Sequence, residues 1–281
     1  MRRRHRNFVN NLMLSLTGVC TLLTISTLFL ILGYLVWNGG QSINLDFFTK
    51  LPVGPGETGG GMANAVVGSA KLIFIACVIG IPIGFIAGVY VSEFGGTTFP
   101  FIIRYVADLL NGVPSIVVGI FAYAVVVLPV KHFSAWAGGF ALAIMLIPIV
   151  VRSTEQFLQA VPTSLREGAF ALGASKWKTV VTVVVPASIS GVLTGVILGV
   201  ARIAGETAPL IFTSFGNQFW SHGFNEPTSA LPVMIYNYAI SPYEDWHRLA
   251  WAAGLVLLGL VLISNIAARL ILARGASTHR S

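Results

Sequence analysis

Six long apolar stretches divide the chain, separated by short polar segments. A helix rises about 1.5 Å per residue, so roughly 20 apolar residues cross the hydrocarbon core of a bilayer. The stretches are residues 12–37, 63–91, 106–130, 135–151, 180–204 and 250–272. The fourth is the shortest and is expected to use neighbouring residues at its ends. The pattern predicts an all-α, polytopic membrane protein with six transmembrane helices.

The composition agrees with a surface that faces lipid. Hydrophobic residues make up 55% of the chain and charged residues only 10%, whereas a soluble domain carries about 25% charge. So few charged groups cannot coat a water-facing surface of this size. The net charge of +7 alone would also fit a nucleic-acid partner, but the placement of the charges indicates a different cause.

Most Lys and Arg residues fall on one side of the six predicted spans. If the amino terminus is inside, the inner segments hold Arg2, Arg3, Arg4, Arg6, Arg104, Arg152, Arg166, Lys176, Lys178, Arg269, Arg274 and Arg280. The outer loops hold only Lys50, Lys131 and Arg248, and Lys71 and Arg202 lie within spans. This positive-inside bias predicts that both termini are cytoplasmic. The basic balance then reflects anionic lipid headgroups rather than nucleic acid.

The basic start of the chain would also suit a signal peptide, but the apolar run that follows is too long and lacks a small-residue cleavage site. We therefore expect a retained helix. The expected division is a cytoplasmic tail (1–11), a first transmembrane helix with an outer loop (12–62), a transmembrane domain (63–272) and a second cytoplasmic tail (273–281). Two polar segments of the domain are large enough to carry function, an inner loop (152–179) and an outer loop (205–249).

The inner loop contains the sequence VPTSLREGAFAL at 161–172, followed by Gly173. Ser164 and Glu167 have the spacing of a capping box at a helix start, and Gly173 suits the left-handed conformation that ends a helix. The pattern predicts a short amphipathic helix. Such a helix either rests on lipid headgroups or docks in a groove of another protein, and its small alanines favour the groove.

The same residues resemble the "EAA" loop of ABC-importer permeases. In that pattern E-A-A is followed by three residues, G, nine residues, and I-x-L-P. Here Glu167, Gly168, Ala169, Gly173 and Pro186 meet every spacing, with Gly168 in place of the first alanine and valines in place of isoleucine and leucine. The resemblance implies a type I ABC-importer permease fold. It also implies that residues 164–177 form a coupling helix that seats in a cleft of a cytoplasmic ATPase, and that the five matching residues serve this coupling.

The end of the fifth span reads ARIAGETAPLIFTS, residues 201–214. Arg202 and Glu206 are four apart, so on a continuous helix they would share a face and could pair. One interpretation is a structural ion pair between helices. The other is a substrate path, because a charge in a span usually faces a partner or a cavity and arginine offers an oxyanion two parallel hydrogen bonds. Glu206 would then hold the guanidinium or accept a bond from a protonated phosphate oxygen.

This R-x-x-G-E-T-A-P-L segment resembles the fifth span of phosphate-importer permeases. Residues 108–121 and 241–251 are also similar to that family, the latter to its A-type subunit. The resemblance implies a phosphate path formed by Arg202, Glu206 and Thr207. Two other cations have open alternatives: Lys71 either snorkels to the outer interface or joins the path, and Arg152 either anchors to headgroups or joins the path. Asp108 is expected to cap the start of the third span.

The sequence lacks the motifs of an enzyme. Residues 173–179 (GASKWKT) lack the second glycine of a phosphate-binding loop, and the five histidines are scattered without metal-ligand spacing. We therefore expect no metal and no cofactor on this chain, with ATP hydrolysis on a separate one. The resemblance implies a bacterial inner-membrane location and three partners: a second permease, an ATPase dimer and an extracytoplasmic phosphate-binding protein. Alternatives are a permease for molybdate or sulfate, and a membrane scaffold that binds an ATPase without moving solute.

Overall fold

The computed structural model describes residues 2–54, 56–57 and 59–278, with side chains described between residues 5 and 270. All regular structure in this part of the chain is helical, which confirms the all-α prediction. The long helices are α1 (Arg2–Gly40), α3 (Ala63–Glu93), α4 (Thr98–Gly112), α7 (Ala135–Gln159), α10 (Val185–Ala204) and α13 (Glu244–Thr278). Shorter helices are α2 (Leu45–Thr49), α5 (Ser115–Ala122), α6 (Leu128–Val130), α8 (Thr163–Ala171), α9 (Lys176–Thr179), α11 (Ala208–Thr213) and α12 (Leu231–Ala239). Two π-helical turns are η1 (Tyr123–Val127) and η2 (Val180–Val184).

Five helical segments within the described residues are long and apolar enough to cross a membrane. A sixth span requires the pair Thr98–Gly112 and Ser115–Val130, which is bent by 106°. The sequence prediction of one straight span over 106–130 is therefore wrong in detail. The helix starts earlier, at Thr98, and breaks at Val113 and Pro114, because proline lacks an N–H and disfavours helical backbone in the residue before it.

Helix α7 lies at the centre of the bundle, between α3 and α10. Small residues allow close approach of helices inside a membrane, and both neighbours meet α7 through glycines at every fourth position. Gly80, Gly84 and Gly88 of α3 face Leu146, Val150 and Thr154, and Gly191, Gly195 and Gly199 of α10 face Phe157, Ser153 and Ile149. These contacts fix α3 and α10 against the same helix, and α10 runs antiparallel to α7.

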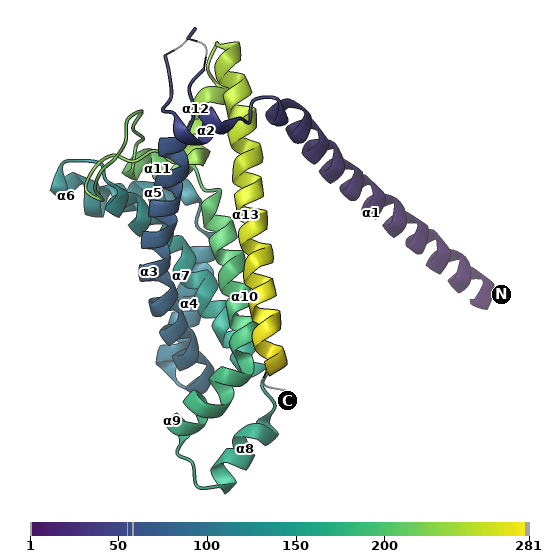
Figure 1. The fold of residues 1–281 in the computed structure, drawn as a ribbon. Helices are drawn as coiled ribbons and strands as arrows, with labels where there is room; N and C mark the ends of the chain where they lie inside the picture. Colours follow the sequence, from purple (N-terminus) through teal and green to yellow (C-terminus); the bar gives the residue numbers. More distant parts are fainter. Residues whose placement is uncertain (1, 55, 58, 279–281) are drawn as a thin grey trace.

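Helix α1 projects away from this bundle (Figure 1). Only its last turns contact the rest of the protein, where Gly39 abuts the backbone of Trp251 and the Tyr34 and Trp251 rings lie 5.2 Å apart. The helix begins at Arg2, so residues 2–11 of the segment expected as a tail are helical. At the other terminus α13 continues to Thr278, and residues 279–281 of the expected tail lie outside the described residues.

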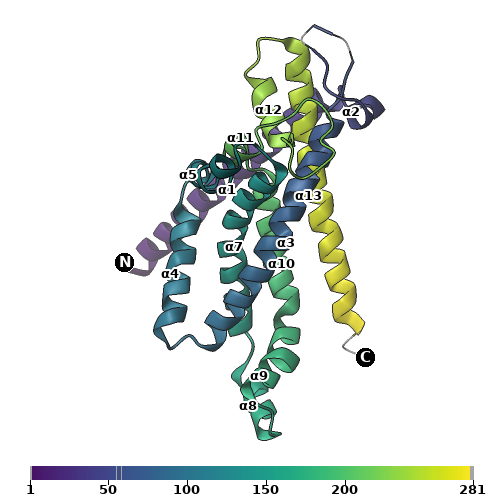
Figure 2. The same ribbon diagram turned by 90° about the vertical axis from the view of Figure 1, so that its left-hand side faces the viewer.

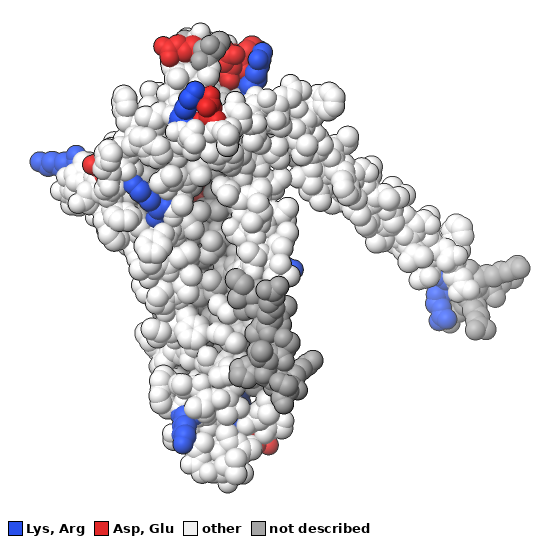
Figure 3. Space-filling model, viewed as in Figure 1, with Lys and Arg blue, Asp and Glu red and all other residues white. Residues whose placement is uncertain are grey.

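The bundle has two distinct ends (Figure 2). One carries α8 and α9, both within segment 152–179. Helix α7 fills the start of that segment, up to Gln159, and α9 leads through η2 into α10. The other carries α11, α12 and the start of α13, all within the segment 205–249 expected as a loop. Charged atoms gather mainly at these ends, and the flank between them in Figure 3 is largely uncharged among the described residues. This distribution suits a protein that spans a bilayer.

Candidate functional site

Helix α8 starts two residues earlier than the capping box requires. Its N-cap is Pro162, with no side-chain cap, and Thr163 is the first helical residue. Proline has no N–H to donate the reciprocal bond of a capping box, and Glu167 is the fifth helical residue rather than the third. The prediction that Ser164 caps the helix through Glu167 is therefore wrong, and Glu167 remains exposed.

The other end of α8 matches the prediction. Gly173 has φ +80°, its N–H bonds to the Phe170 carbonyl at 2.9 Å, and the Ala174 N–H bonds to the Ala169 carbonyl at 3.1 Å. These two bonds are the Schellman pattern, which needs a left-handed residue and is strain-free with glycine. Gly173 thereby ends α8 sharply and turns the chain toward α9.

The side of α8 that faces away from the bundle exposes several large apolar side chains. Leu172 is 90% exposed, and Leu165 and Phe170 are each 47% exposed. Gly168 has open space around it. Together with Trp177 of α9, which is 72% exposed, these residues form a surface that another protein or lipid would cover.

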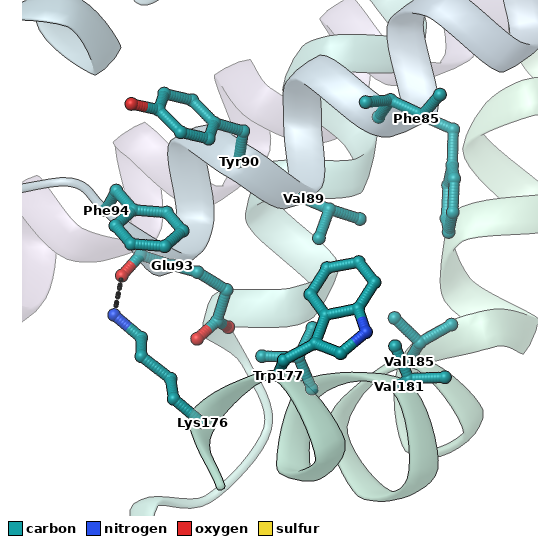
Figure 4. Close-up of a pocket in the computed structure, with 11 residues that line it drawn as sticks. Phe85, Val89, Tyr90, Glu93, Phe94, Lys176, Trp177, Val181 and Val185 are labelled. Atoms are coloured by element: carbon teal, nitrogen blue, oxygen red, sulfur yellow. Dashed lines mark hydrogen bonds between the residues drawn. The ribbon is translucent and has the colours of Figure 1, made fainter.

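The covered side of α8 is attached to the end of α3. Arg166 donates to the Glu93 carboxylate at 2.6 Å and to the Leu158 carbonyl at 2.9 Å. Lys176 donates to the Glu93 carbonyl at 2.8 Å, marked in Figure 4, and lies 4.1 Å from the centre of the Phe94 ring. Charged contacts therefore attach α8 and α9 to the end of α3.

Pro186 lies where α9 leads into α10. It is the second residue of α10 and follows the π-helical turn η2. The Val185 N–H bonds five residues back, to the Val180 carbonyl, which accommodates a proline that cannot donate. Beside this turn, η2, α9 and α3 enclose an apolar groove of about 490 Å³ lined by Phe85, Val89, Trp177, Val181 and Val185 (Figure 4).

A ladder of alternating charges joins α4 to α7 inside the bundle. Asp108 pairs with Arg152 at 2.9 Å, and Arg152 pairs with Glu155 at 2.7 Å. Glu155 also pairs with Arg104, which donates a further bond to the Val91 carbonyl at 3.1 Å. Asp108 lies inside α4, not at a helix start, so the prediction that it caps a helix is wrong. Arg152 is held by two carboxylates rather than directed only to headgroups.

Arg202 differs from Arg152 because none of the ion pairs among the described residues includes it. Helix α10 ends at Ala204, and the Glu206 N–H bonds to the Ile203 carbonyl. The backbone therefore leaves the helix before Glu206, and the four-residue spacing no longer places the two side chains on one face. The predicted pair of Arg202 and Glu206 is absent, and the Arg202 side chain is exposed.

Arg152 and Arg202 border the contact between α7 and α10, which we call the seam. Gly195 of α10 abuts Ser153, the residue after Arg152. Arg202 follows Gly195 by seven residues, almost two full turns, so it emerges on nearly the same face of α10 about 10.5 Å further along the axis. Arg152 lies beside the seam on α7, where its side chain turns to Asp108 of α4.

The other predicted path residues lie elsewhere. Lys71 of α3 donates to the carbonyl and hydroxyl oxygens of Ser221 at 2.5 and 3.2 Å, so it fastens the 205–249 segment rather than pointing freely to lipid. Glu206 and Thr207 lie in the break between α10 and α11. Helix α11 packs on α5, with Pro209 against Gly119, so the breaks of two interrupted spans are brought near each other.

Sequence reasoning missed Arg104 and Glu155 as members of this site. A signal was present, because Arg104 and Asp108 are four apart in one apolar stretch, and Arg152 and Glu155 are three apart after another. Both spacings place charges on one helical face. What the spacing could not supply was that these two faces meet. Among the described residues, no group of three His, Cys, Asp or Glu side chains could hold a metal ion.

Residues 80–275 match the model of one protein family, which is described as the inner membrane component of binding-protein-dependent transport systems. The match covers most of the chain and includes both ends of the seam and the whole of α8. The chain therefore belongs to this family of multi-pass ABC-importer permeases, which are transmembrane components and not enzymes.

Sequence similarity to individual permeases shows which group within this family the chain resembles. The chain is 46% identical over 264 residues to the phosphate transport system permease protein PstA of Yersinia pestis, covering 91% of this chain and 90% of that protein. It is 46% identical over 262 residues to PstA of Haemophilus influenzae, covering 93% of each. Within the family, the chain groups with the PstA permeases.

A solved structure agrees on the fold. It is that of a bacterial ABC transporter involved in the import of the acidic polysaccharide alginate, with a TM-score of 0.66, 14% identity, and coverage of 91% of this chain and 94% of that one. At that identity the similarity concerns the fold alone. It supports the type I permease fold predicted from the EAA spacing.

Proposed function

We propose that the chain is the permease subunit of an ATP-driven importer of inorganic phosphate. The observation that carries this proposal is the seam between α7 and α10, which Arg152 and Arg202 border about two helical turns apart. Two arginines at membrane depth are costly unless they serve an anion or a partner. The PstA relatives, which are named for phosphate transport, supply the substrate class.

The interrupted helices support a substrate site near the Arg202 end of the seam. Transporters place substrates where broken helices expose backbone groups at membrane depth. Here the α10 break at Gly205 and the α4 break at Pro114 lie on either side of the contact between α5 and α11. In this proposal Arg202 binds the phosphate, Glu206 and Thr207 line the break, and Lys71 contributes positive charge from α3. The transmembrane domain remains assigned to 63–272.

The α8 end supports coupling to an ATPase. In this proposal Glu167, Gly168 and Ala169 form the docking surface of α8, Gly173 sets its end, and Pro186 with η2 connects it to α10. Its apolar exposed face needs a cover, and its attachment to Glu93 and Leu158 gives it a rigid link to α3 and α7. ATP hydrolysis takes place on the partner chains, and this chain holds no cofactor.

The orientation follows from the same assignment. We propose that the α8 end faces the cytoplasm with both termini, and that the α12 end faces a phosphate-binding protein on the other side of the inner membrane. A second homologous permease completes the path across the exposed seam. The positive-inside pattern of Lys and Arg is the independent support for this direction.

The test is uptake of labelled phosphate by the purified complex in vesicles, with and without ATP on the α8 side. We expect uptake that requires ATP and the binding protein. Labelled sulfate and molybdate are tested in parallel. ATP-dependent uptake of either, with no phosphate uptake, would assign the permease to another oxyanion. A complex that hydrolyses ATP but moves no anion would instead favour a regulatory scaffold.

A further inference from the structure

The guanidinium of Arg152 is fully engaged by two carboxylates from different helices. Its Nε lies 2.9 Å from Oδ1 of Asp108, and its Nη2 donates to Oδ2 of the same side chain at 3.0 Å. Its Nη1 donates to Glu155 Oε2 at 2.7 Å. Asp108 therefore occupies the Nε and Nη2 edge with both oxygens, in the bidentate geometry by which arginine binds phosphate.

The two carboxylates differ in how firmly they are held. The Glu155 side chain is 5% exposed. It also pairs with Arg104 and accepts a hydrogen bond from Gln159 at 3.2 Å. The Asp108 side chain is 54% exposed, and Arg152 provides its only ion pair among the described residues. Glu155 thus fixes the orientation of Arg152, and Asp108 is the partner that can leave without breaking the rest of the ladder.

We propose that Asp108 is an internal competitor for phosphate at Arg152. It occupies the bidentate edge when no anion is present, swings aside when phosphate binds there, and displaces phosphate toward the α8 side by returning. The inference rests on the proposed role of Arg152 in the path. It adds a residue to that path. Asp108 sets how long phosphate stays bound at Arg152, the last cationic side chain before the α8 side.

Charge balance explains why such a competitor is useful. Uncompensated charge at membrane depth is costly, and without Asp108 the group of Arg104, Glu155 and Arg152 would carry a net charge of +1. With Asp108 in place the ladder of Arg104, Glu155, Arg152 and Asp108 carries two positive and two negative charges. Exchange of Asp108 for phosphate keeps Arg152 paired at every stage. Asp108 also sits four residues before Gly112, the last residue of α4.

The test compares the complete complex with its Asp108→Asn variant in vesicles. Phosphate is loaded on the α8 side at increasing concentration, and ATP-driven uptake from the other side is measured per assembled complex. Asparagine keeps the shape but cannot compete as an anion. If Asp108 occupies the edge about nine-tenths of the time, its loss raises the apparent affinity of Arg152 for phosphate about tenfold. We therefore expect half-inhibition at about one-tenth of the phosphate concentration, with a lower maximal rate.

Two controls separate this role from a structural one. Asp108→Glu retains the carboxylate and should recover most of the wild-type sensitivity. Asp46→Asn removes an exposed aspartate that pairs with Lys50 at 2.7 Å, far from the seam, and should change nothing. The inference is overturned if Asp108→Asn assembles with unchanged sensitivity to phosphate, or if it fails to assemble while Asp108→Glu succeeds. Absence of phosphate uptake by the wild-type complex would instead overturn the proposed function.

Discussion

The Arg166 guanidinium and the Glu93 carboxylate meet at 2.6 Å although 73 residues separate them in the chain. The pair joins the exposed helix α8 to the last residue of α3, and Glu93 is only 6% exposed. A hydrogen bond to a charged group in such a place stabilises by about 1.5–3 kcal/mol. The contact is strong enough to keep α8 in a fixed position relative to the bundle.

Replacing Glu93 by glutamine should loosen α8 without unfolding the bundle. The loss of about 1.4 kcal/mol or more corresponds to a tenfold change in an opening equilibrium. We expect amide hydrogen exchange over 163–175 to be at least about tenfold faster. Glu244→Gln is the matched control, because that glutamate is 85% exposed with only a distant histidine partner. Equal protection of α8 in both variants would contradict a clamping role.

Reversing the charge of Glu167 should uncouple transport while leaving the fold intact. Glu167 is exposed and does not cap α8, so the change leaves the α8 fold intact and tests the proposed contact with the ATPase. We expect phosphate uptake and transport-stimulated ATP hydrolysis to fall by about tenfold or more in Glu167→Lys, the size of one lost charge-assisted contact. Glu57→Lys reverses another exposed glutamate and should leave both rates unchanged. Full transport by Glu167→Lys would remove this residue from the mechanism.

Arg202 should tolerate neither lysine nor an exchange of charge with Glu206. The two residues form no pair, so Arg202→Glu combined with Glu206→Arg has no lost contact to restore, and it puts a carboxylate in the anion path. We expect assembled complex but little uptake. Arg202→Lys keeps the charge but loses the bidentate fork, so uptake should fall about tenfold. Arg248→Lys, on the exposed start of α13, is the control. Near-normal uptake by the exchanged variant would mean that Arg202 does not contact phosphate.

Labelling of single cysteines should place the two ends of the bundle on opposite sides of the membrane. Ser175 is exposed at the α8 end, and Asn225 is exposed at the α12 end. Ser229 is a poor reporter because it is buried and bonded to Asn217. In a background without Cys20 and Cys77, an impermeant reagent applied outside should label only the Asn225→Cys protein. Labelling of both positions from one side would exclude the six-span orientation.

Gly68 should be intolerant of even one methyl group. A Cβ there would overlap the Ser229 carbonyl oxygen and press on Thr228, and both belong to the backbone that joins α11 to α12. We expect Gly68→Ala to destabilise the protein by about 1–3 kcal/mol, measured as a lower Tm of the purified complex. Gly259→Ala, in an open part of α13, should be neutral or stabilise by up to about 1 kcal/mol. Equal Tm values would contradict this close contact.

The sequence alone determined those features that depend on neighbours along the chain. Apolar runs of about 20 residues predicted the spans, the EAA spacing predicted α8 and its family, and Gly173 predicted the left-handed end that the structure has. Each of these is a local property, because helix periodicity and the backbone freedom of glycine act over a few residues.

Only the tertiary structure decided which faces meet. The spacing of Arg202 and Glu206 predicted a pair on one continuous helix, but α10 ends at Ala204 and the pair does not form. Arg152 instead pairs with Asp108, which lies 44 residues away on another helix. Close packing of α3, α4 and α10 around α7 brings such residues together, and it depends on the shape of every helix in the bundle at once. A sequence pattern that repeats every few residues does not determine which helix faces meet in the bundle.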